Sequence, residues 1–68
     1  LVNIAFEIKK KEDLTKISPF INERGSTNVK IKIKDYDKIV VFELKDKRKI
    51  NNEILKKLKK EGFLPIIQ

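Results

Sequence analysis

Apolar and polar residues alternate along residues 2–8 and 29–34, and in a third segment, residues 39–45, Val40, Phe42 and Leu44 share one face. A period of two is typical of a strand that buries one face and exposes the other. The last two segments are separated only by the tetrapeptide 35–38, whose aspartates suit a tight turn. We therefore predict three strands here, with the second and third joined as an antiparallel hairpin.

A helix is predicted over residues 12–24, because aliphatic residues recur there at helical spacing. They are Leu14, Ile17 and Ile21. Pro19 lacks an amide hydrogen and disfavours helical dihedrals at the residue before it, so we expect a kink or a break at this point. Gly25 follows the segment and is predicted to end it in the left-handed conformation.

A second helix is predicted after the charged run 46–49, which we interpret as a solvated connection. Asn51 is a favourable N-cap, and Ile50 before it can pack against Leu55 as a hydrophobic staple. Gly62 is expected to end this helix. The pattern thus indicates a helix of about three turns with one apolar stripe.

A last strand is predicted over residues 63–67, and Pro65 within it requires a position at the edge of a sheet. The order strand, helix, strand, strand, helix, strand favours an α+β fold. We predict the ferredoxin-like, split βαβ sandwich, with two helices on one face of a four-stranded antiparallel sheet. The first and third strands are central in that topology. The strand 29–34 would then lie at an edge, where its lysines prevent aggregation between strands.

Length and composition limit the class of protein further. The chain has 68 residues, with 17 lysines and arginines against 10 aspartates and glutamates, and no cysteine. A net charge of +7 favours acidic partners or polyanions at long range. Without disulfides, a signal peptide or a long apolar run, we expect a soluble, cytoplasmic protein that does not contact a membrane. The start at Leu1, directly in a strand pattern, indicates one small domain, residues 1–68, excised from a longer chain.

Catalysis within this chain is not expected, because histidine and cysteine are absent and no glycine-rich phosphate loop occurs. Asp35 and Asp37 form a close acidic pair, which we interpret as turn residues rather than metal ligands. The three lysines of residues 9–11 lack the glycines that would bring backbone amides round an anion. We predict no catalytic residue, metal, cofactor or small-molecule ligand.

One candidate surface for binding is the row Lys30, Lys32 and Lys34. These side chains could contact phosphates or an acidic partner. Phe6 and Phe42 share their strand faces with aliphatic residues, so we expect both in the core and no platform for stacking bases. Weak, non-specific contact with DNA or RNA stays open as an alternative.

The other candidate surface is an apolar patch on the sheet face away from the helices. Alternation places Ala5, Ile39 and Val41 on that face, bordered by the lysine row. Exposed apolar patches with a polar rim are typical of protein interaction sites. We therefore predict that a partner protein docks on these three residues.

The segments EDLTKISPFINERG, VKIKIK, VVFEL and INNEILKKLKKEG follow one another between residues 12 and 62, and a short strand then closes the chain. This succession resembles the extreme C-terminal domain of the bacterial replicative DNA polymerase III alpha subunit. The resemblance covers nearly the entire chain, residues 12–67. It implies that the parent polypeptide is a DNA-directed DNA polymerase whose active site lies far upstream. It also implies that this domain binds the tau subunit of the clamp loader and tethers the polymerase within the replisome.

Overall fold

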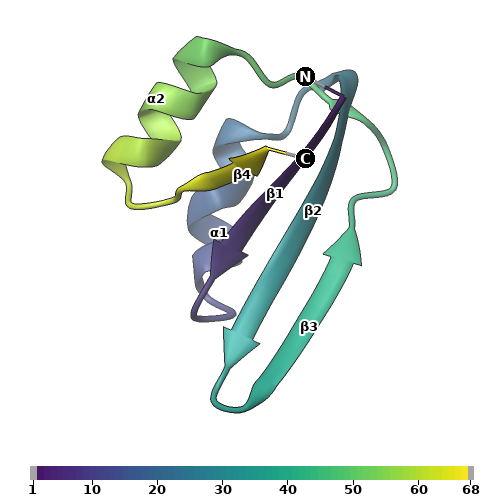
Figure 1. The fold of residues 1–68 in the computed structure, drawn as a ribbon. Coiled ribbons are helices and arrows are strands. Elements are labelled where there is room, and N and C mark those ends of the chain that lie inside the picture. The colour runs from purple at the N-terminus through teal and green to yellow at the C-terminus, as the bar shows by residue number, and fades with distance from the viewer. Residues whose placement is uncertain (1, 68) are drawn as a thin grey trace.

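The computed structural model describes residues 2–67, except for the side chains of Asp35 and Ile67. These residues form four strands, two α-helices and one 3₁₀ helix, in the order expected from the sequence (Figure 1). The elements are β1 (Asn3–Ile8), α1 (Asp13–Ile17), η1 (Ser18–Phe20), β2 (Arg24–Asp35), β3 (Lys38–Glu43), α2 (Asn52–Lys60) and β4 (Pro65–Ile67). The predicted α+β class is confirmed. No helix within the described part is long and apolar enough to cross a membrane.

The sheet is mixed rather than antiparallel, and its strand order is β3-β2-β1-β4. β1 pairs with β2 in parallel, with Ile4 opposite Val29, while β3 and β4 are antiparallel to their neighbours. The ferredoxin-like, antiparallel topology is therefore wrong, because the third strand does not lie between the first and the second. β2 is central and β3 is an edge strand. The central position of β1 and the edge position of β4, with Pro65, are as predicted.

The parallel pairing of β1 with β2 follows from the matched apolar positions of the two strands. Their helix-facing residues lie opposite one another in successive pairs, Ile4–Val29, Phe6–Ile31 and Ile8–Ile33. A crossover of about a dozen residues is enough to join neighbouring parallel strands, and residues 9–23 provide one. The two short helices then cover β1 and β2 but not β3 (Figure 1).

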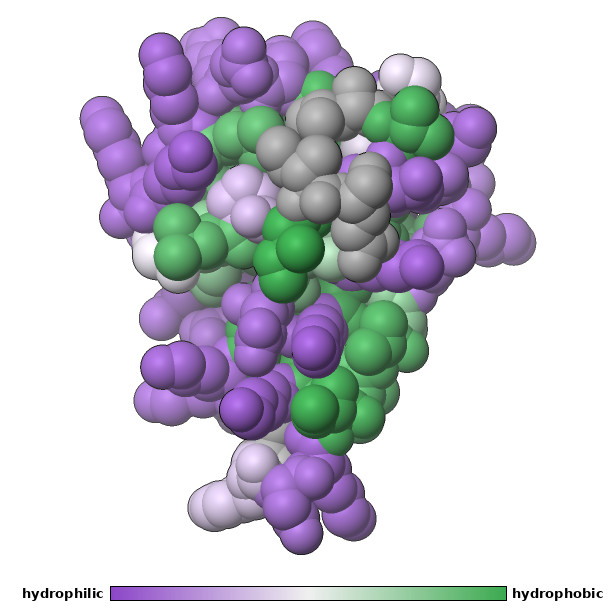
Figure 2. All heavy atoms as spheres, in the orientation of Figure 1, coloured by the Kyte–Doolittle hydropathy of each residue, from purple (hydrophilic) through white to green (hydrophobic). Residues whose placement is uncertain are grey.

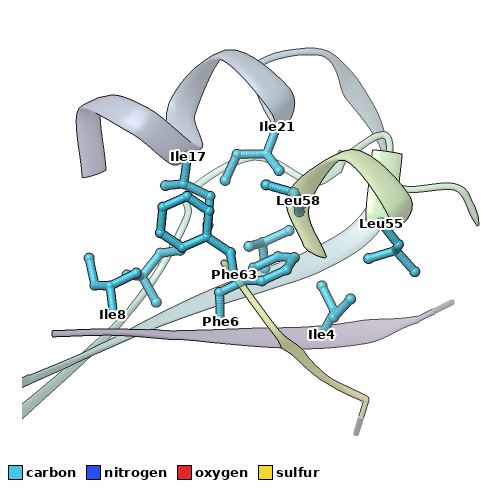
Figure 3. Packing of buried hydrophobic residues seen from close by; sticks show 10 residues of the cluster. Ile4, Phe6, Ile8, Ile17, Ile21, Leu55, Leu58 and Phe63 are labelled. Atoms are coloured by element: carbon cyan, nitrogen blue, oxygen red, sulfur yellow. The ribbon is translucent and has the colours of Figure 1, made fainter. Parts of the chain in front are cut away.

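The hydrophobic core lies between the helices and the two inner strands (Figure 3). Its buried members are Ile4, Phe6, Ile8, Ile17, Ile21, Val29, Ile31, Leu55, Leu58 and Phe63. Phe6 is fully buried, as predicted. Burial of a large apolar side chain stabilises a fold by about 1.5–3 kcal/mol. This single cluster therefore accounts for most of the stability that such a small domain can have.

Pro19 divides the first predicted helix into two short pieces. α1 ends at Ile17, and the chain continues as the 3₁₀ helix η1, which contains Pro19 near its start. Gly25 does not end this helix in a left-handed conformation, contrary to the prediction, but lies within β2. A Cβ atom at Gly25 would overlap the backbone of Lys49, so the glycine allows two segments of backbone to cross closely.

The charged run 46–49 is only partly a solvated connection. The amide of Lys49 donates a 2.8 Å hydrogen bond to the carbonyl oxygen of Glu23. Arg48 is half-buried, and its guanidinium donates to the carbonyl oxygen of Ile21 over 3.2 Å. These bonds attach the run to the start of β2 and to the end of η1. The prediction missed them because they join residues far apart in the sequence.

α2 begins and ends as predicted. The Asn51 side chain accepts a 2.8 Å hydrogen bond from the amide of Ile54, which caps the first turn. Gly62 has φ 90°, and the amide of Phe63 donates over 2.9 Å to the carbonyl oxygen of Leu58. This bond is typical of a Schellman motif. Because Leu58 and Phe63 are both buried, the helix end is also fixed by the core.

Candidate interaction surface

The helices leave one face of the sheet uncovered, here called the open face. Cross-strand pairing defines the rows of side chains that lie on it. The first row is Ile66, Ala5, Lys30 and Glu43, the second is Glu7, Lys32 and Val41, and the third contains Lys34 and Ile39. Directly opposed residues project to the same side of a sheet. The open face is therefore mainly polar on β2 and more apolar on β3 and at Ile66 of β4.

The lysine row follows the centre of the sheet and not its edge. Lys30 and Lys32 are half-buried between neighbouring strands, whereas Lys34 is exposed. The prediction that these lysines protect an edge is wrong, because β2 has a partner strand on both sides. Glu43 lies opposite Lys30 and Glu7 lies opposite Lys32, so the positive charge is least balanced around Lys34.

The second uncovered surface is the β3 edge, residues 38–43, all of which are exposed. Its four central residues, 39–42, are apolar. Val40 and Phe42 lie on the helix side and are 54% and 36% exposed. The prediction that Phe42 belongs to the core is wrong, because the helices do not reach β3. Figure 2 shows hydrophobic surface over this part of the molecule, beside hydrophilic side chains.

The lysine row divides the predicted patch of Ala5, Ile39 and Val41. Ala5 lies on β1 and is only 6% exposed, whereas Ile39 and Val41 lie on β3 and are 54% and 55% exposed. β2 runs between these two positions. Ile39 and Val41 are instead continuous with Val40 and Phe42 along one strand. The four consecutive exposed apolar residues of the described chain therefore lie at the β3 edge rather than at the centre of the open face, while Leu64 and Ile66 are exposed at the opposite edge.

A hollow opens on the helix side of the sheet, next to the end of β3. Its lining residues are Leu14, Ile17, Ser18, Ile21, Ile31, Leu44 and Arg48. α1 has only five residues and ends before Pro19, so it covers little of this side. The interruption at Pro19 is the signal in the sequence from which this uncovered area could have been anticipated.

The aromatic residues of the strands point away from the open face. Phe6 and Phe42 pair with Ile31 across the sheet and share its helix-facing side. Within the described strands, the open face therefore has no aromatic side chain on which bases could stack. Tyr36 is 94% exposed, but it lies at the hairpin tip between β2 and β3. Its exposure was not predicted from the sequence.

These surfaces can bind a ligand through positive charge and through exposed apolar area. No group of three or more acidic side chains that could hold a metal ion occurs among the residues described. Asp37 lies in the turn between β2 and β3, as predicted, while the side chain of Asp35 lies outside the described part. The lysines of residues 9–11 are exposed in the loop before α1.

Comparisons of the chain with protein-family models, with curated proteins and with solved structures found no match. The class of the protein is therefore defined by its fold and surface: a small α+β domain with a positive open face and an exposed apolar edge strand. The resemblance to the polymerase III alpha subunit stays a prediction from the sequence.

Proposed function

We propose that the chain is a non-catalytic interaction domain that tethers its parent polypeptide, a replicative DNA polymerase alpha subunit, to the tau subunit of the clamp loader. The choice of partner is supported by the resemblance of residues 12–67 to the C-terminal domain of that polymerase. The choice of a polypeptide as ligand is supported by the exposed apolar strand β3. The tether needs no metal or cofactor, because it acts by binding alone.

The observation that carries this proposal is the exposure of consecutive apolar residues at the β3 edge. Ile39 and Val41 are 54% and 55% exposed on the open face. Val40 and Phe42 are exposed on the other side of the same strand. Charged residues make up 40% of the chain. A surface with so many charged residues has no need of four consecutive apolar residues for solubility. Concentrated exposed apolar area on a small domain is typical of a protein interaction site.

The substitution Val41→Asp tests this function. Val41 lies opposite Lys32 on the open face, so the fold can accommodate a carboxylate there. In contact with a partner, the same carboxylate would be desolvated at a cost of several kcal/mol. We expect the affinity for immobilised tau subunit, measured by surface plasmon resonance, to fall by at least about tenfold. The thermal unfolding curve should stay unchanged.

Leu64→Asp is the matched control, because it introduces the same charge at another exposed aliphatic residue. Leu64 is 68% exposed and precedes β4, at the opposite edge of the sheet from β3. Its affinity for tau should equal that of the unmodified chain. Unchanged binding by Val41→Asp, or an equal loss in both variants, would contradict the proposal.

The lysine row favours a second candidate function, the non-specific binding of single-stranded DNA or RNA. Lys30, Lys32 and Lys34 lie on one side of a central strand that no helix covers on that side. Alternate residues of a strand are about 6.6 Å apart, so three such charges extend over about 13 Å. A nucleic-acid backbone could follow this row. Specific reading of bases is not favoured, because the aromatic side chains of the strands face the helices.

Replacement of Lys30, Lys32 and Lys34 by glutamine tests the second candidate. The logarithm of affinity for single-stranded DNA falls with the logarithm of salt concentration, with a slope of about −0.7 per phosphate contacted. Loss of three contacts should therefore reduce the slope by about 2. Glutamine at the exposed α2 residues Lys56, Lys59 and Lys60 removes the same charge elsewhere. Equal slopes in the two triple variants would exclude binding by the lysine row.

A further inference from the structure

We propose that the partner adds an extended segment to β3 as a fifth strand, and that this segment alternates aliphatic with acidic residues. This inference rests on the proposed function, since it specifies how a partner polypeptide is held. It commits to one occupant of the β3 edge. The backbone, the helix side and the open face of β3 each contribute a separate requirement.

The backbone of β3 provides the template for strand addition. β3 is the outermost strand in the order β3-β2-β1-β4, and no strand formed by residues 2–67 pairs with its outer side. An edge strand presents alternate amide and carbonyl groups outward, ready to pair with another chain. Natural edges are blocked by proline, bulges or central charges. Here the charged residues Lys38 and Glu43 occupy only the two ends of the strand.

The helix side of β3 requires aliphatic residues in the partner. Val40 and Phe42 project to this side and stay 54% and 36% exposed. Side chains directly opposed on neighbouring antiparallel strands are about 4.5–5.5 Å apart at Cβ, so every second residue of an added strand would contact them. Aliphatic residues there would extend the core past Ile31 and Ile33, the β2 neighbours of this pair.

The open face requires acidic residues at the remaining positions. Neighbouring strands are about 4.8 Å apart, so an added strand lies only about 10 Å from β2. Lys32 and Lys34 are opposite Val41 and Ile39, and their long side chains can extend over these residues toward the added strand. Glutamate in the partner would cover the aliphatic residues with its stem and place its carboxylate near the lysines. The net charge of +7 favours the same partner at long range.

A second copy of the chain does not meet these requirements. Its own charge of +7 would repel the first copy. Pairing of two β3 strands about a two-fold axis perpendicular to the sheet would also place both lysine rows on the same face, where Glu43 is the one carboxylate that β3 contributes. Charge complementarity therefore favours an acidic segment over self-association.

The test uses a synthetic peptide of about ten residues in which valine alternates with glutamate, blocked at both termini. One control has the same composition with its valines and glutamates in two blocks, and another has lysine in place of glutamate. We expect the alternating peptide to bind the chain in a fluorescence anisotropy titration, and each control to bind at least about tenfold more weakly. Equal binding by the block control would overturn the alternation that the proposal requires.

Two methylated versions of the peptide separate strand addition from simple contact between side chains. One carries N-methyl groups on its odd-numbered amides and the other on its even-numbered amides. In an antiparallel or parallel pair only alternate amides face the neighbouring strand. One version should therefore lose binding, while the other keeps it within about twofold. Equal loss in both versions, or no loss in either, contradicts strand addition.

Amide hydrogen exchange identifies the site and the occupant. The alternating peptide should slow exchange at alternate residues of β3 and leave β4, the other edge, unchanged. Protection of β3 that appears without peptide and is lost on dilution would indicate a second copy instead. Protection by oligothymidylate but not by peptide would indicate a polyanion. Either result overturns the proposal.

The outcome also separates this inference from the proposed function. If tau binds and Val41→Asp weakens it, but tau leaves exchange at β3 unchanged, the tether stands and strand addition fails. If the peptide binds with the expected dependence on methylation but tau does not bind, strand addition stands and the assigned partner is wrong.

Discussion

β1 and β3 both place apolar residues on the helix side of the sheet and differ completely in the burial of those residues. Ile4 and Phe6 of β1 are 0% exposed, while Val40 and Phe42 of β3 are 54% and 36% exposed. All four side chains project to the helix side of one sheet. The difference arises from position, because α1 and α2 cover β1 and β2 and do not extend over β3 (Figure 1).

An apolar position in a strand thus indicates which way a side chain points and not what covers it. On β1 the helices supply the cover and the residues stabilise the fold. On β3 the same residue types stay in contact with water, where they contribute less to stability and are free to contact a partner. Matched substitutions on the covered strands β1 and β2 and on the exposed strand β3 test this difference.

The largest difference is expected between Phe6→Ala and Phe42→Ala. Phe6 is fully buried, so its truncation leaves a cavity and should cost about 3–5 kcal/mol of unfolding free energy, enough to unfold much of a domain of this size. Phe42 is 36% exposed, and water can fill the space it leaves, so we expect a loss of about 1 kcal/mol. Urea denaturation followed by circular dichroism measures both.

Similar losses in the two phenylalanine variants would show that β3 is covered in solution, and the comparison would then fail. If Phe6→Ala is too unstable for a transition to be fitted, Phe6→Leu gives a smaller change at the same position. It should still cost more than Phe42→Leu.

A smaller difference is expected between Val29→Thr and Val41→Thr, which exchange one methyl group for a hydroxyl group. Val29 is 0% exposed, and a hydroxyl buried without a partner costs about 1–3 kcal/mol. Val41 is 55% exposed, so its hydroxyl stays hydrated and the change should lie within about 0.5 kcal/mol. Thermal unfolding of the two variants under identical conditions provides the measurement. A substantial loss at Val41 would contradict its exposure.

The smallest effect is expected from weakening α2, one of the two helices that cover β1 and β2. Asn51→Ala removes the side-chain oxygen that accepts the Ile54 amide at 2.8 Å, and should cost about 1 kcal/mol. The neighbouring variant Asn52→Ala is the control and should be nearly neutral, since Asn52 is exposed at the first position of α2 and alanine is a good helix former. Urea denaturation compares the two. An equal effect in both would mean that Asn51 does not cap α2.

Weakening α2 should also affect the two strands differently. Amide exchange of β1 depends on the core and should accelerate in Asn51→Ala. The outward amides of β3 are already open to water and should exchange at the same rate as before.

Much of the local structure could be predicted from the sequence because its signals lie within a few residues of one another. Apolar residues at every second position identified β1, β3 and residues 29–34 of β2, but not the start of β2 at Arg24, which was predicted as helix. Asn51 and Gly62 marked the ends of α2, and Pro19 marked the break after α1. Gly25 was misinterpreted, since its role depends on the distant backbone of Lys49. The sequence identified Lys30, Lys32 and Lys34 as a row on one side of a strand. It did not predict that this strand is central in the sheet.

The sequence by itself determined the number, type and order of the elements and the side to which each strand's apolar residues point. Strand order depends on pairing between distant segments, and burial depends on how far two short helices extend. Only the tertiary structure therefore decided that β1 pairs in parallel with β2, that the lysine row is central, and that β3 is the exposed edge.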